Sequence, residues 1–390
     1  MNRESLISIT KVCSDGDWIE SKDQSSDGIR LVQTGNVGNG VYLDKTDRSK
    51  FVSEETFSRL RCTEIFPGDV LVSRLPDPIG RACIIPQTNQ KMITAVDCTI
   101  LRFDETKCLP NYFVFFSRSN DYHFQIEQST FGATRQRVSR KNLEQIKIPL
   151  PSLPEQQKIA AHLDSIQSAI DNKKQQLQQL DELVKSKFVE MFGENPVESG
   201  KWKVEKLSSI CKVQTGGTPS RMHPEYFEGN IPWITTANLG VNELNYDDAM
   251  EYITQEAVDN SATKIIPAHS LFIGIRVGVG KCSINNVDMC SNQDICGLSG
   301  FDVARTNLLF VKKVIDSYED YFDNAKRGTT IKGVKSDTIK ELKIFLPELE
   351  LQTTFAEYVQ KIDSAKSIIK TQLVDLQELL DSKMDEYFGE

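Results

Sequence analysis

The chain contains the stretch Ile146-Lys-Ile-Pro-Leu-Pro-Ser-Leu153, and 196 residues later it contains Leu342-Lys-Ile-Phe-Leu-Pro-Glu-Leu349. The same shift holds along the residues that follow, so that Phe192-Gly-Glu194 matches Phe388-Gly-Glu390. Solenoid repeats recur about every 20–50 residues, so a period this long indicates a duplicated domain. The sequence therefore predicts two similar halves.

The parts of the chain that precede these stretches match more loosely. Ile29-Arg-Leu-Val-Gln-Thr-Gly-Asn-Val-Gly38 parallels Ile231-Pro-Trp-Ile-Thr-Thr-Ala-Asn-Leu-Gly240. We therefore read the 390 residues as a head, a helical segment, a second head and a second helical segment. Their predicted bounds are 1–150 for the first head, 151–199 for the first helical segment, 200–346 for the second head and 347–390 for the second helical segment.

Both helical segments carry apolar residues in alternating steps of four and three, which is the heptad pattern of a coiled coil. Pro154 is typical of a helix start and Gly193 of a helix end. Because equal length and register make the two helices natural partners, we predict an antiparallel coiled coil. The alternative is two separate amphipathic helices, each lying on its own head. The predicted seam consists of Ile159, Leu163, Ile166, Ile170, Leu177, Leu180, Val184, Phe355, Val359, Ile362, Ile369, Leu373, Leu376 and Leu380.

The composition is that of a globular protein, with 39% hydrophobic and 26% charged residues. No apolar run approaches the roughly 18–20 residues of a membrane span, so we expect no membrane partner. The first residues lack the basic-then-apolar layout of a signal peptide. The nine cysteines form no CxxC pair, which argues against a zinc cluster or a disulfide framework. Together these features predict a cytoplasmic protein.

The net charge of −9 comes from the helical segments, which together hold 9 Lys and Arg against 18 Asp and Glu. The first head holds 20 basic residues against 19 acidic ones, and the second holds 17 against 18. Acidic helices are poor nucleic-acid ligands, whereas neutral heads can still carry local basic patches.

Short runs rich in β-branched and aromatic residues dominate the heads, and turns such as Pro67-Gly-Asp69 separate them. We expect a few helices as well, near 112–117 and 317–324. Each head is therefore predicted to be an α+β domain. The predicted strands are Val70–Ser73, Ala82–Ile85, Thr99–Phe103 and Leu271–Ile275.

A basic segment precedes each helical segment, at Thr130–Lys141 and at Lys326–Lys335. Each contains glycine, threonine and valine in that order, with four basic residues and no acid. Glycine lets the backbone approach a phosphate, and arginine can pair with guanine through two hydrogen bonds. The alternative is a solvated basic turn. The predicted DNA-binding residues of these segments are Thr134, Arg135, Arg137, Arg140, Lys141, Lys326, Arg327, Thr330, Lys332 and Lys335.

A weaker match between the heads adds four further candidates for DNA binding. Gly80-Arg81 parallels Gly280-Lys281, and an arginine precedes each pair. We therefore also predict DNA contacts from Arg74, Arg81, Arg276 and Lys281.

Motifs of catalysis are weak or missing. Asn195-Pro196-Val197 is not the Asn/Asp-Pro-Pro-aromatic motif of an adenine methyltransferase, and Cys282 follows Gly280-Lys281 where a P-loop needs Ser or Thr. Pro76-Asp77 with Glu105-Thr-Lys107 matches a loose nuclease pattern, for which chance is the alternative explanation. The four histidines show no metal-ligand spacing. We therefore predict no catalytic residue and no metal site.

Over its whole length the chain resembles the specificity (S) subunit of type I restriction–modification systems. The resemblance rests on Ile148-Pro-Leu-Pro-Ser-Leu-Pro-Glu-Gln156 before a long helix, on Thr215-Gly-Gly-Thr-Pro-Ser220 followed by Ile231-Pro-Trp-Ile234, and on the duplicated layout. The second helix departs from the pattern, with Glu350-Leu351-Gln352 where the first has Pro154-Glu155-Gln156.

The resemblance implies a non-catalytic subunit with two target recognition domains, one for each half of a split site in double-stranded DNA. In that family the antiparallel coiled coil sets the spacing of the half-sites. The family's partners are two methyltransferase (M) subunits, docked on the helices, and two restriction/translocase (R) subunits. S-adenosylmethionine, Mg²⁺ and ATP are then expected on the partners, with no cofactor bound by this chain.

Three alternatives remain open at this point. One is the specificity subunit of a two-subunit system, in which nuclease and methyltransferase share one chain. Another is a coiled-coil scaffold whose heads bind protein. The third is an enzyme with an unrecognised active site.

Overall fold

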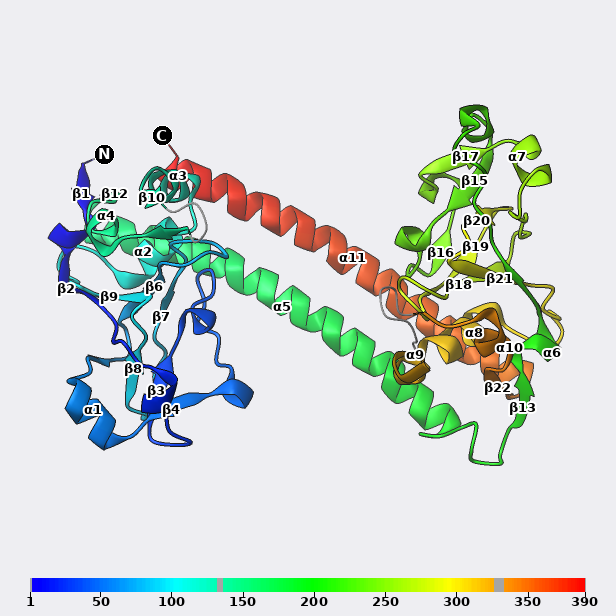
Figure 1. Cartoon of the computed structure of the whole chain (residues 1–390), viewed down its shortest axis with the longest axis horizontal. Helices are drawn as coiled ribbons and strands as arrows, with labels where there is room; N and C mark the ends of the chain where they lie inside the picture. Colours follow the sequence, from blue (N-terminus) through cyan, green and yellow to red (C-terminus); the bar gives the residue numbers. More distant parts are fainter. Residues whose placement is uncertain (1, 132–135, 326–332, 390) are drawn as a thin grey trace. The chain divides into compact units, whose positions relative to one another are not determined.

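The computed structural model describes residues 2–131, 136–325 and 333–389. The chain forms two compact units, a first unit of Met1–Gln176 with Ile369–Glu390 and a second unit of Leu177–Ile368. Each unit contains one head and a part of both long helices, α5 (Leu153–Phe192) and α11 (Leu349–Phe388) (Figure 1). The boundaries between the two units therefore fall within the predicted helical segments, at 176/177 and 368/369, and not at the ends of those segments.

The first unit contains two four-stranded sheets. The antiparallel sheet has the order β2 (Thr10–Asp15), β9 (Cys98–Phe103), β6 (Val70–Ser73) and β7 (Ala82–Ile84). The mixed sheet has the order β4 (Lys50–Val52), β3 (Ile29–Val32), β8 (Met92–Thr94) and β5 (Glu64–Ile65), in which β3 and β8 are parallel. Two-stranded ribbons join β1 (Arg3–Ser5) to β12 (Lys147–Pro149), and β10 (Thr130–Phe131) to β11 (Arg137–Val138).

The second unit repeats this plan with small changes. Its larger sheet has the order β14 (Lys212–Thr215), β21 (Ile295–Ser299), β18 (Ser270–Gly274), β19 (Cys282–Asn285) and β16 (Glu243–Leu244). Its smaller sheet has the order β17 (Glu251–Ile253), β15 (Ile231–Ile234) and β20 (Cys290–Ser291), in which β15 and β20 are parallel. The ribbon pairs β13 (Lys203–Lys206) with β22 (Lys343–Leu346).

Both units also contain short helices. Those of the first unit are α1 (Glu54–Leu60), α2 (Pro110–Phe116), α3 (Asn120–Gln128) and α4 (Arg140–Leu143). Those of the second are α6 (Leu207–Ile210), α7 (Gln255–Asp259), α8 (Leu308–Asp316), α9 (Glu319–Ala325) and α10 (Ser336–Lys340). The predicted α+β class is confirmed, as are the four predicted strands, each within one residue at either end.

The central strands read as continuous apolar runs because both of their faces are buried. Val70 and Val72 of β6 belong to the hydrophobic cluster that includes the helices, whereas Leu71 belongs to a cluster on the other side of the sheet. In β18, Phe272 lies in one cluster and the residues on either side of it lie in another. Alternate residues of a strand point to opposite faces, so each of these strands stabilises two cores.

The heads match in detail where the sequences match. The Asn36 side chain accepts a hydrogen bond from the Gln33 backbone N–H at 2.9 Å and donates to the Leu43 carbonyl. Asn238 accepts from the Thr235 N–H at 2.9 Å and donates to the Asp248 carbonyl. The predicted correspondence of 29–38 with 231–240 is therefore confirmed by equivalent turns.

The two long helices pair in an antiparallel sense within each unit. In the first unit, Leu163 at the start of α5 shares a core with Leu380 at the end of α11. In the second unit, Phe192 at the end of α5 shares a core with Val359 near the start of α11. The fourteen predicted seam residues are all buried or half-buried. Residues of the heads belong to both cores as well. Each long helix therefore packs on the other helix and also on a head, so both predicted arrangements hold in part.

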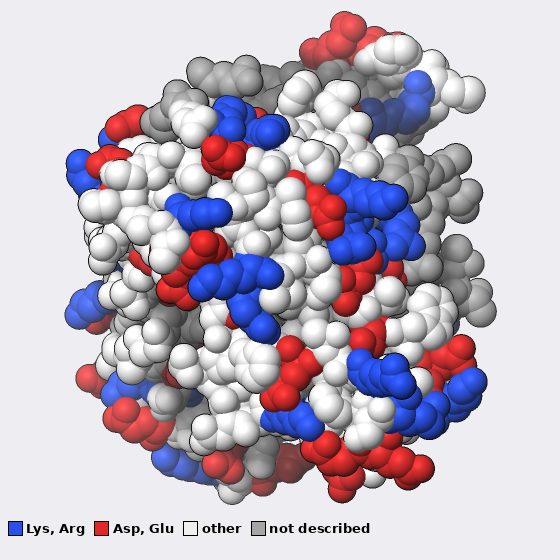
Figure 2. Space-filling model, turned by 90° about the vertical axis from the view of Figure 1, so that its left-hand side faces the viewer, with Lys and Arg blue, Asp and Glu red and all other residues white. Residues whose placement is uncertain are grey.

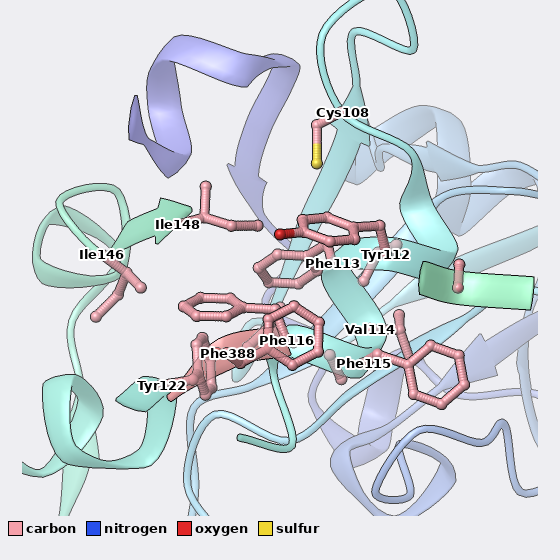
Figure 3. Close-up of a cluster of buried hydrophobic side chains, with 14 of the residues drawn as sticks. Cys108, Tyr112, Phe113, Val114, Phe115, Phe116, Tyr122, Ile146, Ile148 and Phe388 are labelled. Atoms are coloured by element: carbon pink, nitrogen blue, oxygen red, sulfur yellow. The ribbon is translucent and has the colours of Figure 1, made fainter. Parts of the chain in front are cut away.

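The end of α11 closes the first unit's core. Figure 3 shows the Phe388 ring among Tyr112, Phe116 and Tyr122. Its ring centroid lies 5.4 Å from that of Tyr112 and 5.7 Å from that of Phe116. Phe192 occupies the matching place in the second unit, where it is 2% exposed. Each long helix therefore begins in one unit and ends in the core of the other.

Gln156 and Gln352, which match in the sequence repeat, are both completely buried. The Gln156 Oε1 accepts from the Leu109 N–H at 2.9 Å, and its Nε2 donates to the carbonyls of Lys107 and Pro151. Gln352 makes the same set of bonds in the second unit. Each glutamine thus ties the start of its long helix to the loop that precedes a head helix.

We expect Gln156→Leu to lower the free energy of unfolding by about 3 kcal/mol, because three backbone groups lose their buried partner. Urea unfolding of the full chain measures this. Gln176→Leu, at an exposed position of α5, is the control and should change the value by less than about 0.5 kcal/mol. Equal effects of the two substitutions would contradict the assignment.

Candidate nucleic-acid interface

The loop that joins β6 to β7 in the first unit, residues 74–80, is built around Arg81. The Arg81 side chain is buried, and its guanidinium group donates to five backbone carbonyls. Burial lowers the pKa of this guanidinium, although the group remains charged at neutral pH. The acceptors are the carbonyl oxygens of Thr34, Val37, Leu75, Pro76 and Pro78, at 2.6–3.0 Å.

The described end of the basic segment packs on this loop. The Val138 N–H donates to the Arg74 carbonyl at 3.3 Å, and the Arg74 N–H donates to the Asp97 carbonyl at 2.9 Å. The Arg74 side chain is buried, with Nη2 donating to the Val96 carbonyl and lying 3.5 Å from Asp15. Burial lowers the pKa of Arg74, and the charge of Asp15 partly offsets the shift.

The burial of Arg74 and Arg81 corrects the prediction that they contact DNA. The Arg81 guanidinium donates to five backbone carbonyls and the Arg74 guanidinium faces the Val96 carbonyl and Asp15. The two residues are only 8% and 4% exposed, so they offer little surface to a ligand. They are better described as residues that hold the loop in shape. Their role depends on backbone carbonyls that the fold brings around the two side chains. Nothing in the sequence indicates that these carbonyls lie there.

The remaining predicted residues of this segment are more accessible. Arg137 is half-exposed and lies 3.7 Å from Asp97 through its Nη2. Arg140 opens α4, donates to the Cys13 carbonyl at 3.1 Å and forms an ion pair with Glu144 at 3.2 Å. Lys141 is exposed. The first unit thus brings Arg137 and Arg140 near Arg74, since Arg140 and Arg74 both lie close to Asp15 and the Val138 N–H bonds to the Arg74 carbonyl.

The second unit has the same arrangement around the loop 275–280, between β18 and β19. The Val334 N–H donates to the Ile275 carbonyl, and the Ile275 N–H donates to the Asp294 carbonyl, both at 2.8 Å. Arg276 is exposed and forms an ion pair with Asp294 at 3.0 Å. Lys281 and Lys335 are exposed.

The backbone hydrogen bonds correct one sequence alignment and confirm another. Ser73 pairs with Arg81 as Gly274 pairs with Lys281, so Arg81 and Lys281 are equivalent as predicted. Arg74, however, is equivalent to Ile275 and not to Arg276, because the loop of the first unit is one residue longer. The remaining predicted residues, Thr134, Arg135, Lys326, Arg327, Thr330 and Lys332, lie outside the described residues and stay predictions.

Charge on the heads is mixed. Figure 2 shows a face of the first unit on which small groups of Lys and Arg are separated by Asp, Glu and uncharged residues. No continuous basic stripe crosses the described residues of this face. This pattern agrees with the nearly neutral composition of the first head.

The loose nuclease match is not supported by the fold. In the β6–β9 pair, Ser73 lies opposite Cys98, so Asp77 follows the sheet end at which β9 begins. Glu105 follows Phe103, at the other end of β9. The five residue-to-residue steps of β9, from Cys98 to Phe103, separate the two ends by roughly 17 Å. The two carboxylates therefore lie at opposite ends of the sheet and form no common site.

The cysteines and histidines show no sign of a reactive or metal-binding site among the described residues. All nine cysteines are free and eight are buried; burial raises the pKa of Cys83 and of Cys282 to about 12, so neither thiol is ionised at neutral pH. Within residues 2–131, 136–325 and 333–389, no three His, Cys, Asp or Glu gather as metal ligands would. His162 bonds to the Tyr387 hydroxyl at 2.8 Å and packs on its ring. No helix among the described residues is long and apolar enough to span a membrane.

The family model described as the type I restriction modification DNA specificity domain matches the chain twice, at residues 8–182 and 199–378. The chain belongs to this family. Each match covers one head with most of the long helix that follows it, so the duplication seen in the sequence is a duplication of the family's domain. The predicted family and the fold of two similar domains with two long helices are confirmed.

Curated relatives carry the same description. The chain is 29% identical over 163 residues to the type I restriction enzyme MjaIX specificity subunit of Methanocaldococcus jannaschii, which covers 42% of this chain and 38% of that one. It is 30% identical over 257 residues to the EcoR124I/EcoR124II specificity subunit of Escherichia coli, covering 60% and 59%. These matches span less than two thirds of either relative. The putative MjaX specificity subunit is 21% identical over 362 residues, covering 88% and 82%.

Solved structures agree on the fold. The S subunit of a type I restriction–modification system from M. genitalium has a TM-score of 0.57 and 13% identity, covering 100% of this chain and 96% of that one. A chain from a type I R-M system, whose report concerns complex assembly and conformational transition, has a TM-score of 0.60 and 17% identity, covering 99% and 97%. At such identities the likeness shows a shared fold.

Sequence reasoning missed the two aspartates, Asp97 and Asp294, that face the exposed arginines of the two heads. A signal did exist, because each aspartate immediately precedes a buried strand, β9 or β21. Without the strand pairing, these two acids resemble many other surface acids, and nothing in the spacing links them to Arg137 or Arg276.

Proposed function

We propose that this chain is the DNA-specificity subunit of a type I restriction–modification complex and that each of its heads reads one half of a split site in double-stranded DNA. The observation that carries the proposal is the double match of the DNA specificity domain, once on each unit. The equivalent loops, each with accessible basic residues beside it, support one reading surface per head.

The chain itself then performs no catalysis, and the chemistry belongs to its partners. Two methyltransferase subunits dock on the acidic outer faces of α5 and α11, and two restriction/translocase subunits complete the complex. S-adenosylmethionine, Mg²⁺ and ATP bind to these partners. The excess of acidic residues in the helical segments supports a protein-docking role for them, because DNA repels acidic surfaces.

Exchanging residues 1–150 for the corresponding head of another family member is expected to change one half-site and leave the other intact. The reason is that each head carries its own loop and basic segment. Mapping methylated adenines in host DNA before and after the exchange measures the result. Exchanging 200–346 is the matched control and should alter the other half-site. A change in both half-sites from a single exchange would contradict the model of one head for each half-site.

A further inference from the structure

An aspartate occupies the same backbone position in both heads. The carbonyl of Asp97 accepts a hydrogen bond from the Arg74 N–H at 2.9 Å, and the carbonyl of Asp294 accepts one from the Ile275 N–H at 2.8 Å. The two side chains are partly accessible, at 26% and 20% exposure. Each carboxylate therefore stands at the edge of its loop, with part of its surface open to solvent.

The arginine that faces this aspartate comes from a different segment in each head. In the first, Arg137 of β11 places Nη2 3.7 Å from the Asp97 Oδ1. In the second, Arg276 of the β18–β19 loop places Nη1 3.0 Å from the Asp294 Oδ1. The arginine side chains are 41% and 53% exposed. The heads thus share an arginine–aspartate pair although the arginines are not equivalent in sequence.

Gly333 explains why only one of the two segments supplies the arginine. Val138 and Val334 make equivalent bonds to their loops, so the residue before each, Arg137 or Gly333, is also equivalent. A Cβ on Gly333 would lie 3.1 Å from the Cγ of Arg276 and 2.8 Å from the Ile275 carbonyl oxygen. Arg276 therefore lies over the place where a side chain at 333 would begin.

This arrangement suits recognition of a base edge. A guanidinium group has five N–H donors, so a pair with one carboxylate leaves donors free for the O6 and N7 acceptors of guanine. The carboxylate restricts the arginine before DNA binds, which reduces the entropy lost on binding. An exposed ion pair contributes little to the free energy of unfolding, so stability alone does not account for the pair in both heads.

We propose that Arg137 and Arg276 are the specificity-determining arginines of the two heads, each reading a guanine of its half-site, and that Asp97 and Asp294 are the positioning residues behind them. The proposal rests on the proposed function, because it names the side chains that carry the reading. The two heads of one chain thus supply an arginine from different segments, β11 in the first and the β18–β19 loop in the second.

The test selects bound sequences from a library of randomised duplexes, using the full chain in complex with its methyltransferase partner. Arg137→Gln is expected to reduce the preference for one guanine in one half-site by on the order of 5- to 150-fold. Arg276→Gln should do the same at one position of the other half-site. Asp97→Asn and Asp294→Asn should relax the same two positions by a smaller factor, without lowering the melting temperature.

Lys141→Gln is the matched control, because it removes one positive charge from an exposed residue of the same basic segment. It should weaken binding to all sequences alike, as loss of a phosphate contact does. A uniform loss of this kind in Arg137→Gln would overturn the proposal. A wild-type complex with no sequence preference would instead refute the proposed function, so the two failures are distinguishable.

A rescue experiment tests the equivalence of the two placements. Leu75 follows Arg74 as Arg276 follows Ile275, so Leu75→Arg combined with Arg137→Gly copies the second head's arrangement into the first. The double variant should recover the guanine preference that Arg137→Gly alone loses. If it melts at the same temperature as Arg137→Gly but recovers no preference, the two arginines are not equivalent and the proposal fails.

Discussion

Phe192→Ala is expected to lower the free energy of unfolding of the second unit by about 3–5 kcal/mol. Phe192 is the last residue of α5, is 2% exposed, and contacts five other aromatic rings at centroid distances of 5.3–6.1 Å. Its truncation would leave a cavity that these rings fill only in part. One of them belongs to Trp202, whose indole N–H donates to the Phe192 carbonyl at 3.1 Å.

Urea unfolding of the full chain, followed by tryptophan fluorescence, measures this effect because Trp202 reports directly on the cavity. The control is Val189→Ala on the same helix, where the side chain is 43% exposed. The control should change the free energy of unfolding by less than about 0.5 kcal/mol. A loss no larger than the control's would show that the helix end does not stabilise the second unit.

Phe388 is buried in the core of the first unit in the same way, so the repeat includes the ends of both long helices. Phe192 and Phe388 match in the sequence because each closes the core of the unit in which its helix ends. Gln156 and Gln352 match because each anchors a helix start. The repeat alone predicts that these residues matter, but their burial depends on packing between segments far apart in the chain.

The fold was largely predictable because periodicity is a local signal. The strands β6 and β9 follow from apolar runs between turns, and α5 follows from its heptads with Pro154 near its start and Gly193 after its end. The site was less predictable, because exposure is a property of the assembled loop. Arg74 and Arg81 look like surface arginines in the sequence, yet both are buried.

Equivalent positions in the two heads show how loosely sequence specifies such a site. Arg81 and Lys281 both follow a glycine, but Arg81 is buried and Lys281 is exposed. Likewise, the arginine that faces the aspartate comes from β11 in one head and from a loop in the other. The shared frame is set by backbone hydrogen bonds, whereas the side chains that use the frame vary.

Arg81→Leu is therefore expected to have a large effect, lowering the free energy of unfolding of the first unit by about 3–5 kcal/mol. Five carbonyls of the loop and its neighbours would lose a charged donor at once. The loop includes Arg74, whose carbonyl accepts a hydrogen bond from the Val138 N–H and so positions the neighbouring Arg137. Loss of the loop's shape should therefore also weaken the guanine preference of the first half-site.

Lys281→Leu is the matched control for Arg81→Leu, because Lys281 occupies the equivalent position and is exposed. It should change stability by less than about 0.5 kcal/mol. Urea unfolding gives the two values, and amide hydrogen exchange locates the loss, which should be greatest in residues 74–80 of the Arg81 variant. Equal destabilisation by the two substitutions would mean that the carbonyls around Arg81 find other donors, and that the loop keeps its shape without the arginine.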